Sequence, residues 1–472
     1  MKIPKDFYLG AASSAWQTEG WSGKKANQDS YLDDWYKHEF FVWHDGLGPN
    51  VATDFMNRYQ EDVELMQKIG LESYRTSINW SRFFSDYEKL VVDEEYAQHI
   101  SDVIDALIAA NVRPMIALEH YELPQVLQDK FGGWNSRKVV DLYVEYAKIC
   151  FKRYGDRVKD WFTFNEPIVP QTRVYLDGIR YPHIIDPKQW MQWNYHKVLA
   201  TAKTIEAFKE LKIEGRIGII HNWEFVYPRS SSYQGDVRAA HICDLFNNRL
   251  YLDPLVNGTY SQEFLDLLQE NKIMFSYQKT DLDLIKNNPV DCVGINLYKP
   301  TRVKERTTAW NEDASFSPTK YYEEFSLPGK KFNFSRGWEI YPPIMYDIAQ
   351  IIKNDYHNVP WFISESGMGI EDETRFKLSD GTIDDSYRIQ FISEHLYWLL
   401  KAVKEGANCE GYMLWAFTDN VSPMNAFKNR YGLIEIDLEQ NLTRRMKKSA
   451  YWYQELIKTR ELPNSTEFAY HE

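Results

Sequence analysis

Short apolar runs rich in β-forming residues alternate along this chain with longer stretches whose apolar positions recur at helical spacing. In the first of the helical stretches, one face collects Phe55, Tyr59, Val63, Met66 and Ile69. The pattern predicts strands at Phe7–Trp16, Glu72–Trp80, Arg113–His120, Asp160–Asn165, Arg216–His221, Asp291–Tyr298, Trp361–Glu365 and Gly411–Asp419. It predicts helices at Phe55–Ile69, Glu95–Ala110, Ser136–Tyr154, Pro187–Leu211, Val237–Arg249, Ile340–Tyr356, Asp385–Glu405 and Arg445–Arg460.

This alternation of strands and helices is typical of a parallel (β/α)8 barrel, here an α/β fold in one domain spanning residues 1–472. A doubly wound open sheet is the alternative, and the lack of a glycine-rich phosphate loop after the first strand disfavours it. Two connections are long, Glu19–Asp54 after the first strand and Lys299–Pro360 after the sixth. Because strand-to-helix loops lie on the catalytic face of a barrel, we expect these two to form walls of a pocket.

The composition is that of a globular protein and argues against a nucleic-acid partner. Of 472 residues, 44% are hydrophobic and 26% charged, and the formal net charge is -13, whereas a phosphate backbone requires a basic surface. A single phosphorylated small molecule could still bind in a local basic pocket. The aromatic share of 15% is high, which fits a carbohydrate cleft and a large aromatic core equally well.

Targeting signals and cysteine pairs are not evident in the sequence. Residues 1–6 have no apolar region of a signal peptide, and no apolar run is long enough to span a membrane. The cysteines lie far apart and are expected to be buried free thiols: Cys150, Cys243, Cys292 and Cys409. We therefore expect a cytoplasmic enzyme that does not associate with membranes.

The ends of the predicted strands carry the candidate chemistry, because the catalytic groups of barrel enzymes come from these positions. In chain order these residues are Gln17, Arg75, His120, Asn165, Glu166, Asn296, Tyr298, Glu365 and Trp415. The set has two carboxylates but no metal-ligand cluster and no Ser-His-Asp set, so we expect neither a metal nor another cofactor. Two carboxylates across a sugar-sized gap are what glycoside hydrolysis needs, one protonated to assist the leaving oxygen and one ionised to attack the anomeric carbon.

Several motifs at these strand ends resemble those of glycoside hydrolase family 1. The segment FYLGAASSAWQTEG at residues 7–20 resembles its N-terminal signature, and TFNEP at residues 163–167 matches its acid/base motif. RTSINWSR at residues 75–82 and NLY at residues 296–298 also match. ISESG at residues 363–367 departs from the usual Thr-Glu-Asn-Gly form of the nucleophile motif but keeps its glutamate and glycine. The resemblance runs from Phe7 to about Tyr453 and implies a (β/α)8 barrel that cleaves β-glycosidic bonds with retention.

The resemblance implies a role for each residue of the site. Glu365 would attack the sugar to form a glycosyl-enzyme, while Glu166 protonates the leaving group and then activates water. Arg75 and Tyr298 would contact Glu365 and keep it ionised. Asn165 would donate to the sugar 2-hydroxyl. Further substrate contacts would come from Gln17, His120, Asn296, Tyr298 and Trp415, although His120 could instead be a core histidine and Trp415 ordinary barrel packing.

The segment after the eighth predicted strand differs from the form usual in enzymes that act on unmodified sugars. There the resemblance leads us to expect Asp-Asn-Phe-Glu-Trp, with the glutamate bound to the sugar 4- and 6-hydroxyls, but this chain has Ser422 in place of that glutamate. A carboxylate would repel a 6-phosphate, whereas a hydroxyl can donate to it. The swap resembles the branch acting on 6-phospho-β-glycosides, in which a Ser, a Lys and a Tyr hold the phosphate. Ser422 and Tyr431 fit that pattern.

The expected lysine is displaced in this loop. Asn429 stands two residues before Tyr431, and Lys428 stands three before it. Either the loop is shifted by one residue so that Lys428 binds the phosphate, or Lys428 points to solvent. Pro423, where phospho-galactosidases tend to have tryptophan, favours a phospho-glucoside over a phospho-galactoside.

The sequence therefore predicts a retaining β-glycosidase that hydrolyses a 6-phosphorylated disaccharide or aryl β-glycoside. Phosphorylated disaccharides arise inside bacteria during sugar import, which agrees with a cytoplasmic location. A β-glucosidase or β-galactosidase acting on unphosphorylated sugars is the alternative, and a non-catalytic sugar-binding relative is disfavoured because both glutamates are present. The aglycone and the oligomeric state, including a homo-oligomer, are left open.

Overall fold

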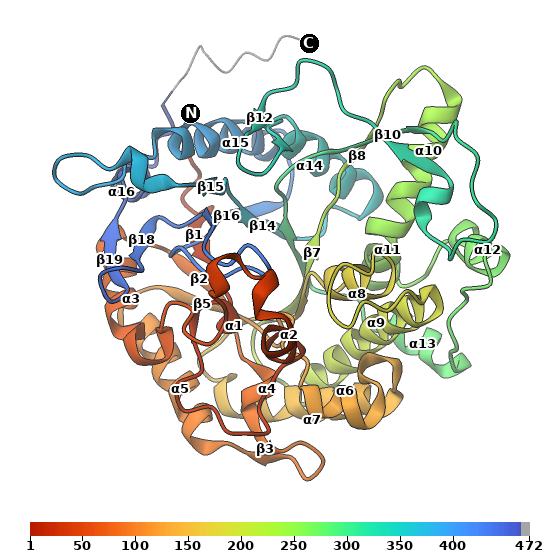
Figure 1. Cartoon of the computed structure of the whole chain (residues 1–472), viewed down its shortest axis with the longest axis horizontal. Coiled ribbons are helices and arrows are strands. Elements are labelled where there is room, and N and C mark those ends of the chain that lie inside the picture. The colour runs from red at the N-terminus through yellow and green to blue at the C-terminus, as the bar shows by residue number, and fades with distance from the viewer. Residues whose placement is uncertain (464–472) are drawn as a thin grey trace.

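The computed structural model describes residues 1–463, and in it eight parallel strands close into a barrel (Figure 1). The strands are β1 (Tyr8–Ala12), β2 (Ser73–Ser77), β5 (Arg113–Ala117), β6 (Asp160–Asn165), β7 (Arg216–Asn222), β9 (Cys292–Asn296), β14 (Trp361–Ser366) and β16 (Cys409–Trp415). Each strand pairs with the next barrel strand in the chain, and β1 pairs with β16 from Tyr8 opposite Gly411 to Ala12 opposite Trp415. The predicted (β/α)8 barrel is confirmed.

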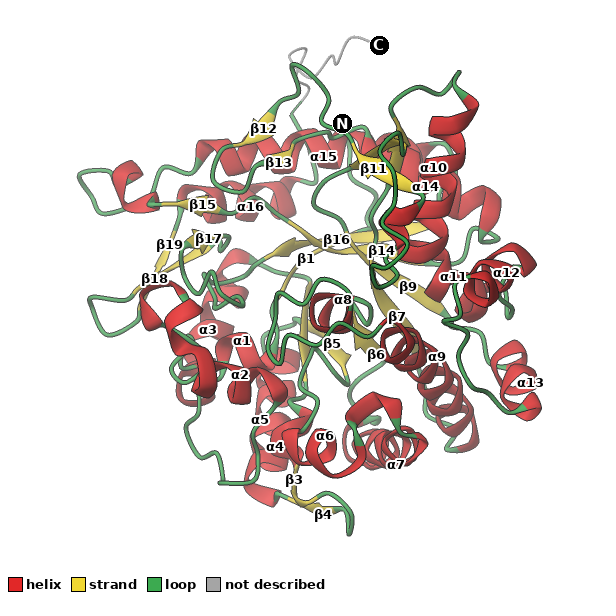
Figure 2. Ribbon diagram, turned by 45° about the vertical axis from the view of Figure 1, so that its right-hand side comes forward, coloured by secondary structure: helices red, strands yellow, loops and turns green. Residues whose placement is uncertain are grey.

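Helices surround the barrel, as the ribbon view shows (Figure 2). Those that return the chain from one barrel strand to the next, or close it at the end, are α3 (Phe55–Ile69), α5 (Glu94–Ala109), α7 (Arg137–Tyr154), α9 (Pro187–Glu210), α10 (Gln234–Asp244) with α11 (Leu250–Val256), α14 (Ile344–Asp355), α15 (Ser386–Lys404) and α16 (Lys448–Thr459). Capping residues mark where two of these helices begin or end. The Asp186 side chain caps α9 just before Pro187, and Gly70 ends α3 in the left-handed conformation at φ 80°.

The barrel interior is filled by side chains from its strands. One buried apolar cluster contains Tyr8, Met115, Ala117, Phe162, Ile220, Cys292, Phe362 and Met413, which come from seven of the eight strands. The ring of Phe362 lies 5.8 Å from that of Tyr8 and 5.4 Å from that of Phe162, measured between centroids. A second and larger cluster packs the strands against the helices. The filled interior leaves the strand ends as the place for a cavity.

Several predicted boundaries are wrong, and three of them lie where an apolar pattern continues beyond the element. The first strand ends at Ala12, because the chain then turns into α1 (Ala15–Thr18). The last barrel strand ends at Trp415 rather than continuing to Asp419. The final helix begins at Lys448, because residues 443–446 form β19 (Thr443–Met446), which pairs with β18 (Ile434–Asp437). Buried positions in these segments carry the same apolar residues, so periodicity does not mark where the backbone turns.

Both long connections are present and contain structure of their own. The first holds α2 (Tyr31–Glu39), which Ser30 caps. The second holds β10 (Thr301–Glu305), β11 (Tyr322–Glu324) and a two-stranded hairpin of β12 (Phe332–Asn333) and β13 (Trp338–Glu339), before α14.

The four cysteines are buried and free, as predicted. Within residues 1–463 no helix is both long enough and apolar enough to cross a membrane. The predicted domain extends to residue 472, and residues 464–472 lie outside the described part of the chain.

Candidate active site

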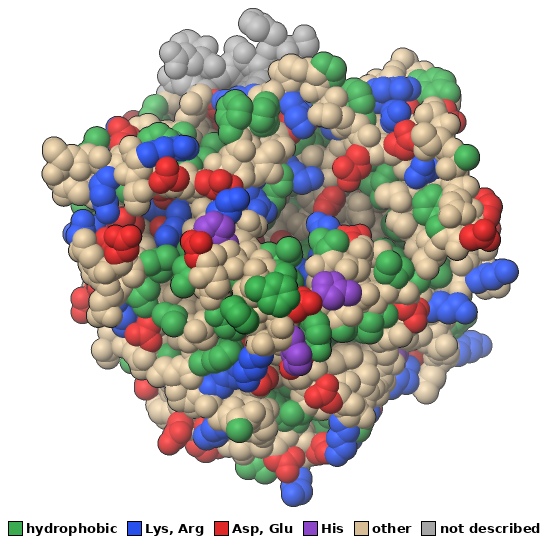
Figure 3. All heavy atoms as spheres, in the orientation of Figure 1, with side chains coloured by type: hydrophobic (Ala, Val, Ile, Leu, Met, Phe, Trp, Pro, Cys, Tyr) green, Lys and Arg blue, Asp and Glu red, His purple; other side chains and the backbone are tan. Residues whose placement is uncertain are grey.

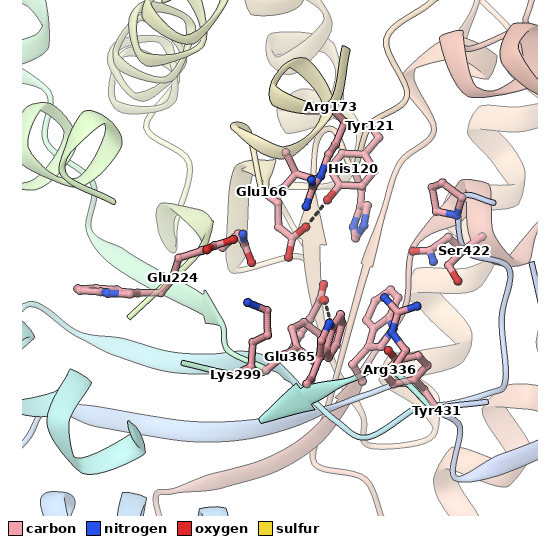
Figure 4. Close-up of a pocket in the computed structure, with 18 of the residues that line it drawn as sticks. His120, Tyr121, Glu166, Arg173, Glu224, Lys299, Arg336, Glu365, Ser422 and Tyr431 are labelled. Atoms are coloured by element: carbon pink, nitrogen blue, oxygen red, sulfur yellow. Dashed lines mark hydrogen bonds between the residues drawn. The ribbon is translucent and has the colours of Figure 1, made fainter. Parts of the chain in front are cut away.

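A cavity of about 420 Å³ is lined by residues from the carboxyl ends of the barrel strands and from the loops that follow them. A hollow is visible in the middle of the face shown in Figure 3, and Figure 4 shows the side chains around the cavity. The predicted residues that line it are Gln17, His120, Glu166, Tyr298, Glu365, Trp415, Ser422 and Tyr431. Arg75, Asn165 and Asn296 are fully buried and lie directly behind this lining.

The carboxylates of Glu166 and Glu365 face one another across the cavity (Figure 4). In both strands the regular pairing is interrupted just before the functional residue, between Phe162 and Asn165 in β6 and between Ile363 and Glu365 in β14. Such irregularities re-aim side chains that a regular strand would direct elsewhere. Glu166 itself has a φ of 44°, which continues this departure from strand geometry.

Glu365 is held by one charged and one neutral donor. The Arg75 guanidinium donates to Oε1, and the Tyr298 hydroxyl donates to Oε2 at 2.6 Å. The pKa of Glu365 is raised to about 7: burial is the largest effect and raises it, the charge of Glu166 also raises it, and Arg75 and the hydrogen bond from Tyr298 lower it. Arg75 has no exposed surface, so its charge acts on Glu365 through a medium that screens it little.

Glu166 has only neutral donors. The hydroxyl of Tyr121 donates to Oε2, and the Asn296 amide donates to Oε1 at 2.9 Å. Burial is the largest effect on this carboxyl and raises its pKa. The hydrogen bonds from Tyr121 and Asn296 lower this pKa, against the larger effect of burial. The charged donor, Arg75, touches Glu365 and not Glu166.

A buried network joins the two carboxylates. Arg75 Nη1 lies 3.2 Å from His120 Nδ1, and the Asn165 amide nitrogen lies 3.2 Å from His120 Nε2. The Asn296 amide, which donates to Glu166, also donates to Asn165 Oδ1 at 3.1 Å. Burial and the charge of Arg75 together lower the pKa of His120 well below its ordinary value, which favours the neutral ring. Since Arg75 can only donate, His120 Nδ1 is the acceptor in their contact.

Gln17 and Trp415 complete the floor of the cavity. The Gln17 amide donates to the Val421 carbonyl at 2.6 Å and accepts from Ser14 at 2.8 Å, which ties the segment after β1 to the loop after β16. The Trp415 ring lies nearly parallel to that of His120, at 6.0 Å and 21°. Both residues thus face the cavity from fixed positions.

The loop after β16 brings Ser422 and Tyr431 to the cavity but does not bring Lys428. Lys428 is 41% exposed, its Nζ lies 3.3 Å from Glu371 Oε1, and it lines a second cavity on the other side of the loop. Of the two alternatives for Lys428, the structure agrees with the one in which its side chain points away from the active-site cavity. Its ammonium group pairs instead with the Glu371 carboxylate, which is 37% exposed.

A buried ion network anchors the same loop. Asp419 accepts from Lys447 Nζ at 2.8 Å and from the Gly432 backbone at 2.9 Å, and Lys447 also pairs with Glu373. Removing one partner of a buried pair leaves an uncompensated charge, so such networks hold a segment in one arrangement. Ser422 and Tyr431 are positioned by this anchor.

Sequence reasoning missed several residues that line the cavity, among them Tyr121, Lys299, Arg336 and Trp338. Tyr121 directly follows His120, so its proximity to a strand end was a usable signal. Arg336 and Trp338 belong to the β12–β13 hairpin, and nothing in their local pattern predicts which part of the barrel mouth the hairpin covers.

Among the described residues, no group of three or more His, Cys, Asp or Glu side chains is arranged to hold a metal ion.

Comparison with known proteins agrees with this geometry. Glycosyl hydrolase family 1 matches residues 1–462. The 6-phospho-beta-glucosidase GmuD of Bacillus subtilis is 44% identical over 455 residues, covering 96% of this chain and 97% of that protein. Beta-glucosidase A of Acetivibrio thermocellus is 33% identical, covering 97% and 98%. The solved structure of a family 1 β-glucosidase from Thermotoga maritima superposes with a TM-score of 0.88 at 29% identity, covering 98% and 99% of the two chains.

Proposed function

The chain belongs to glycosyl hydrolase family 1, a family of retaining β-glycosidases, and from this premise we propose that its substrates are 6-phospho-β-glycosides. The observation that carries the proposal is that Ser422 and Tyr431 line the same cavity as Glu166 and Glu365. A hydroxyl pair at the position of a sugar 6-substituent can donate to a phosphate, and Ser422 takes the place where a carboxylate would repel it. A single barrel domain would then contain both the catalytic glutamates and the residues that bind the phosphate.

The two glutamates would act in two displacements. In the first, Glu365 attacks the anomeric carbon while Glu166 gives its proton to the departing oxygen, and the bond to the aglycone breaks. In the second, Glu166 takes a proton from a water molecule, which attacks the anomeric carbon and releases Glu365. The sugar leaves with its original configuration, and Glu166 is again protonated.

The contacts around the glutamates support this division of roles. Arg75 and Tyr298 stabilise a charge on Glu365, which an attacking carboxylate must have. Burial raises the pKa of Glu166, which favours the protonated form that a general acid needs. Asn165, whose Oδ1 accepts from the Asn296 amide, would donate to the sugar 2-hydroxyl, and Gln17 and Trp415 would contact the rest of the sugar.

Two of the relatives support a glucoside as the substrate, whereas others at 32% and 33% identity, from Clostridium acetobutylicum and Staphylococcus aureus, are named 6-phospho-beta-galactosidases. The relative at 44% identity is named a 6-phospho-beta-glucosidase, and another from Bacillus subtilis, at 32% identity, is named an aryl-phospho-beta-D-glucosidase. Pro423, next to Ser422, agrees with this choice. A disaccharide or an aryl aglycone would lie outside Glu166, against the long loops after β1 and β9. A phosphorylated sugar does not cross a membrane unaided, so the proposed substrate supports a cytoplasmic location for the enzyme.

The decisive experiment compares nitrophenyl β-glucoside 6-phosphate with nitrophenyl β-glucoside as substrates of the unmodified enzyme. We expect kcat/KM to be at least about 100-fold higher for the phosphorylated compound, which corresponds to about 3 kcal/mol of transition-state binding. The galactoside 6-phosphate serves as a third substrate and should be slower than the glucoside 6-phosphate. Faster turnover of the unphosphorylated glucoside would instead identify a β-glucosidase.

A further inference from the structure

The proposed 6-phosphate needs a positive charge close to Ser422 and Tyr431. A phosphate ester carries a charge of about -1.5 to -2 at neutral pH, and proteins that bind one usually supply a charge-assisted hydrogen bond. Two hydroxyl groups provide donors but no charge. The cation must therefore come from another residue of the cavity wall.

The cations of the loop after β16 do not meet this need. Lys428 pairs with Glu371 and lines the second cavity. Arg430 lines that second cavity too, and its Nη1 donates to the Ile436 carbonyl at 3.2 Å.

Other basic residues line the active-site cavity but are occupied or lie elsewhere. Arg173 pairs with Asp177 at 2.6 Å. Arg180 lies over the ring of Trp35, 5.8 Å from its centroid. Lys299 lies on the other side of Glu365 from Tyr431, toward Glu224 (Figure 4). That side is where we place the aglycone.

Arg336 lies where the charge is needed. Figure 4 shows it next to Tyr431, on the side of the cavity that also carries Ser422. Its positive charge acts on the buried Tyr431 hydroxyl and lowers the pKa of that group, against the larger effect of burial, which raises it. Within residues 1–463 Arg336 forms no ion pair, and its Nε is buried without a hydrogen-bond partner. A buried guanidinium nitrogen without an acceptor is costly unless a ligand supplies one.

Arg336 is also held in place before any ligand binds. Its guanidinium carbon lies 4.3 Å from the centroid of the Trp338 ring, and its Nη1 donates to Asn429 Oδ1 at 3.0 Å. The hairpin that carries it is fixed to the segment after β14, where Asn333 donates to the Gly369 carbonyl at 2.8 Å and Ser335 accepts from the Glu371 backbone at 3.0 Å. A stacked, planar guanidinium with free donors is suited to phosphate, because it can form two parallel bonds.

We propose that Arg336, from the β12–β13 hairpin, supplies the charge that binds the substrate 6-phosphate and replaces a lysine of the loop after β16. This inference rests on the proposed function and adds the residue that determines specificity. The phosphate would lie between the Arg336 guanidinium and the hydroxyls of Ser422 and Tyr431. The hairpin would thus contribute to the glycone pocket from the long loop after β9.

The test measures phosphate selectivity, which we define as kcat/KM for nitrophenyl β-glucoside 6-phosphate divided by kcat/KM for nitrophenyl β-glucoside. In Arg336→Gln we expect selectivity to fall about 10- to 100-fold, through a higher KM for the phosphorylated substrate, since bonds to charged groups contribute on that scale. Arg336→Lys should restore most of it, because the charge returns. Lys428→Ala, which removes one charge from the neighbouring loop, is the matched control and should leave selectivity within about twofold.

Each result has one reading. If wild-type selectivity is near one, the proposed function fails and the inference fails with it. If wild-type selectivity is high but Lys428→Ala lowers it and Arg336→Gln does not, the inference alone is overturned. An equal loss on both substrates in Arg336→Gln would assign Arg336 a structural role and would also overturn it. Inorganic phosphate provides a second readout that needs no phosphorylated substrate: it should inhibit hydrolysis of the unphosphorylated glucoside in the wild type and at least tenfold more weakly in Arg336→Gln.

Discussion

The two walls of the cavity are built in different ways. The wall with Glu166 and Glu365 consists of barrel-strand ends, and a continuous buried network that includes Arg75 and Asn296 holds its side chains. The wall with Ser422 consists of loops after β9 and β16, anchored to their surroundings by a few buried ion pairs and side-chain bonds. The first wall is fixed by the whole barrel, whereas the second can change without disturbing it. The comparison leads us to expect that substitutions in the first wall abolish turnover and substitutions in the second change which sugar is accepted.

The largest effect should come from Glu365→Gln. Removing the attacking carboxylate should lower kcat by more than about 10⁴-fold on both phosphorylated and unphosphorylated substrates, as in other enzymes that lose a nucleophile. Substrate binding should persist, as measured by calorimetry. Glu371→Gln, the same change at a glutamate outside the cavity, is the control and should keep near wild-type rates. Comparable activity in Glu365→Gln would show that another group attacks the sugar.

Glu166→Gln should have the next largest effect, and the effect should depend on the leaving group. For aglycones whose oxygen needs a proton, kcat/KM should fall about 10²–10⁴-fold. For a dinitrophenyl glycoside, whose oxygen leaves as a stable anion, the fall in kcat/KM should be much smaller. A loss that is the same for both leaving groups would contradict the role of Glu166 as the general acid.

Ser422→Glu tests the second wall, which is formed by the loops after β9 and β16. A carboxylate near the 6-position should repel the phosphate, because like charges a few ångströms apart repel by several kcal/mol at a partly exposed site. We therefore expect kcat/KM for the phosphorylated glucoside to fall about 100-fold. The value for the unphosphorylated glucoside should change little. Ser422→Ala removes the hydroxyl without adding charge and should give a smaller selective loss. Equal losses on the two substrates would mean that Ser422 does not contact a phosphate.

Tyr298→Phe should have the smallest effect, seen in the pH profile of kcat/KM. Activity should fall at low pH as Glu365 becomes protonated. Its pKa is about 7, above the ordinary value for glutamate, chiefly because of burial. The Tyr298 hydroxyl stabilises the ionised form, so removing it should raise this pKa and shift the acidic limb to higher pH by about one unit. A shift to lower pH, or none, would show that Tyr298 does not support the charge on Glu365.

The two walls also differ in how far they could be predicted from the sequence. The strand-end residues were predictable because the strands alternate regularly with helices and because each residue lies inside a recognisable motif. His120, Asn165, Glu166 and Glu365 therefore meet as expected at the mouth of the barrel. The bulges that re-aim the two glutamates leave no sequence signal and were not foreseen.

For the second wall, the sequence predicted only which residues of the loop after β16 line the cavity together. Ser422 and Tyr431 are close in the sequence and line the cavity together. The sequence left two positions open for Lys428, and in the structure it pairs with Glu371 outside the cavity. Arg336 reaches this wall from a distant hairpin, through contacts of Asn333 and Asn429 that no local pattern encodes. Long-range loop packing is set by the folded barrel, so a residue's local sequence does not identify its neighbours.

Covalent trapping tests the central claim most directly, since it reports the nucleophile and the sugar in one measurement. Dinitrophenyl 2-deoxy-2-fluoro-β-glucoside 6-phosphate should inactivate the enzyme, because the fluorine slows release of the glycosyl-enzyme. Mass spectrometry should then locate a phosphorylated fluoroglucosyl group on Glu365, and the reagent without phosphate should inactivate much more slowly. A label on any other residue, or equal inactivation rates for the two reagents, would contradict the account.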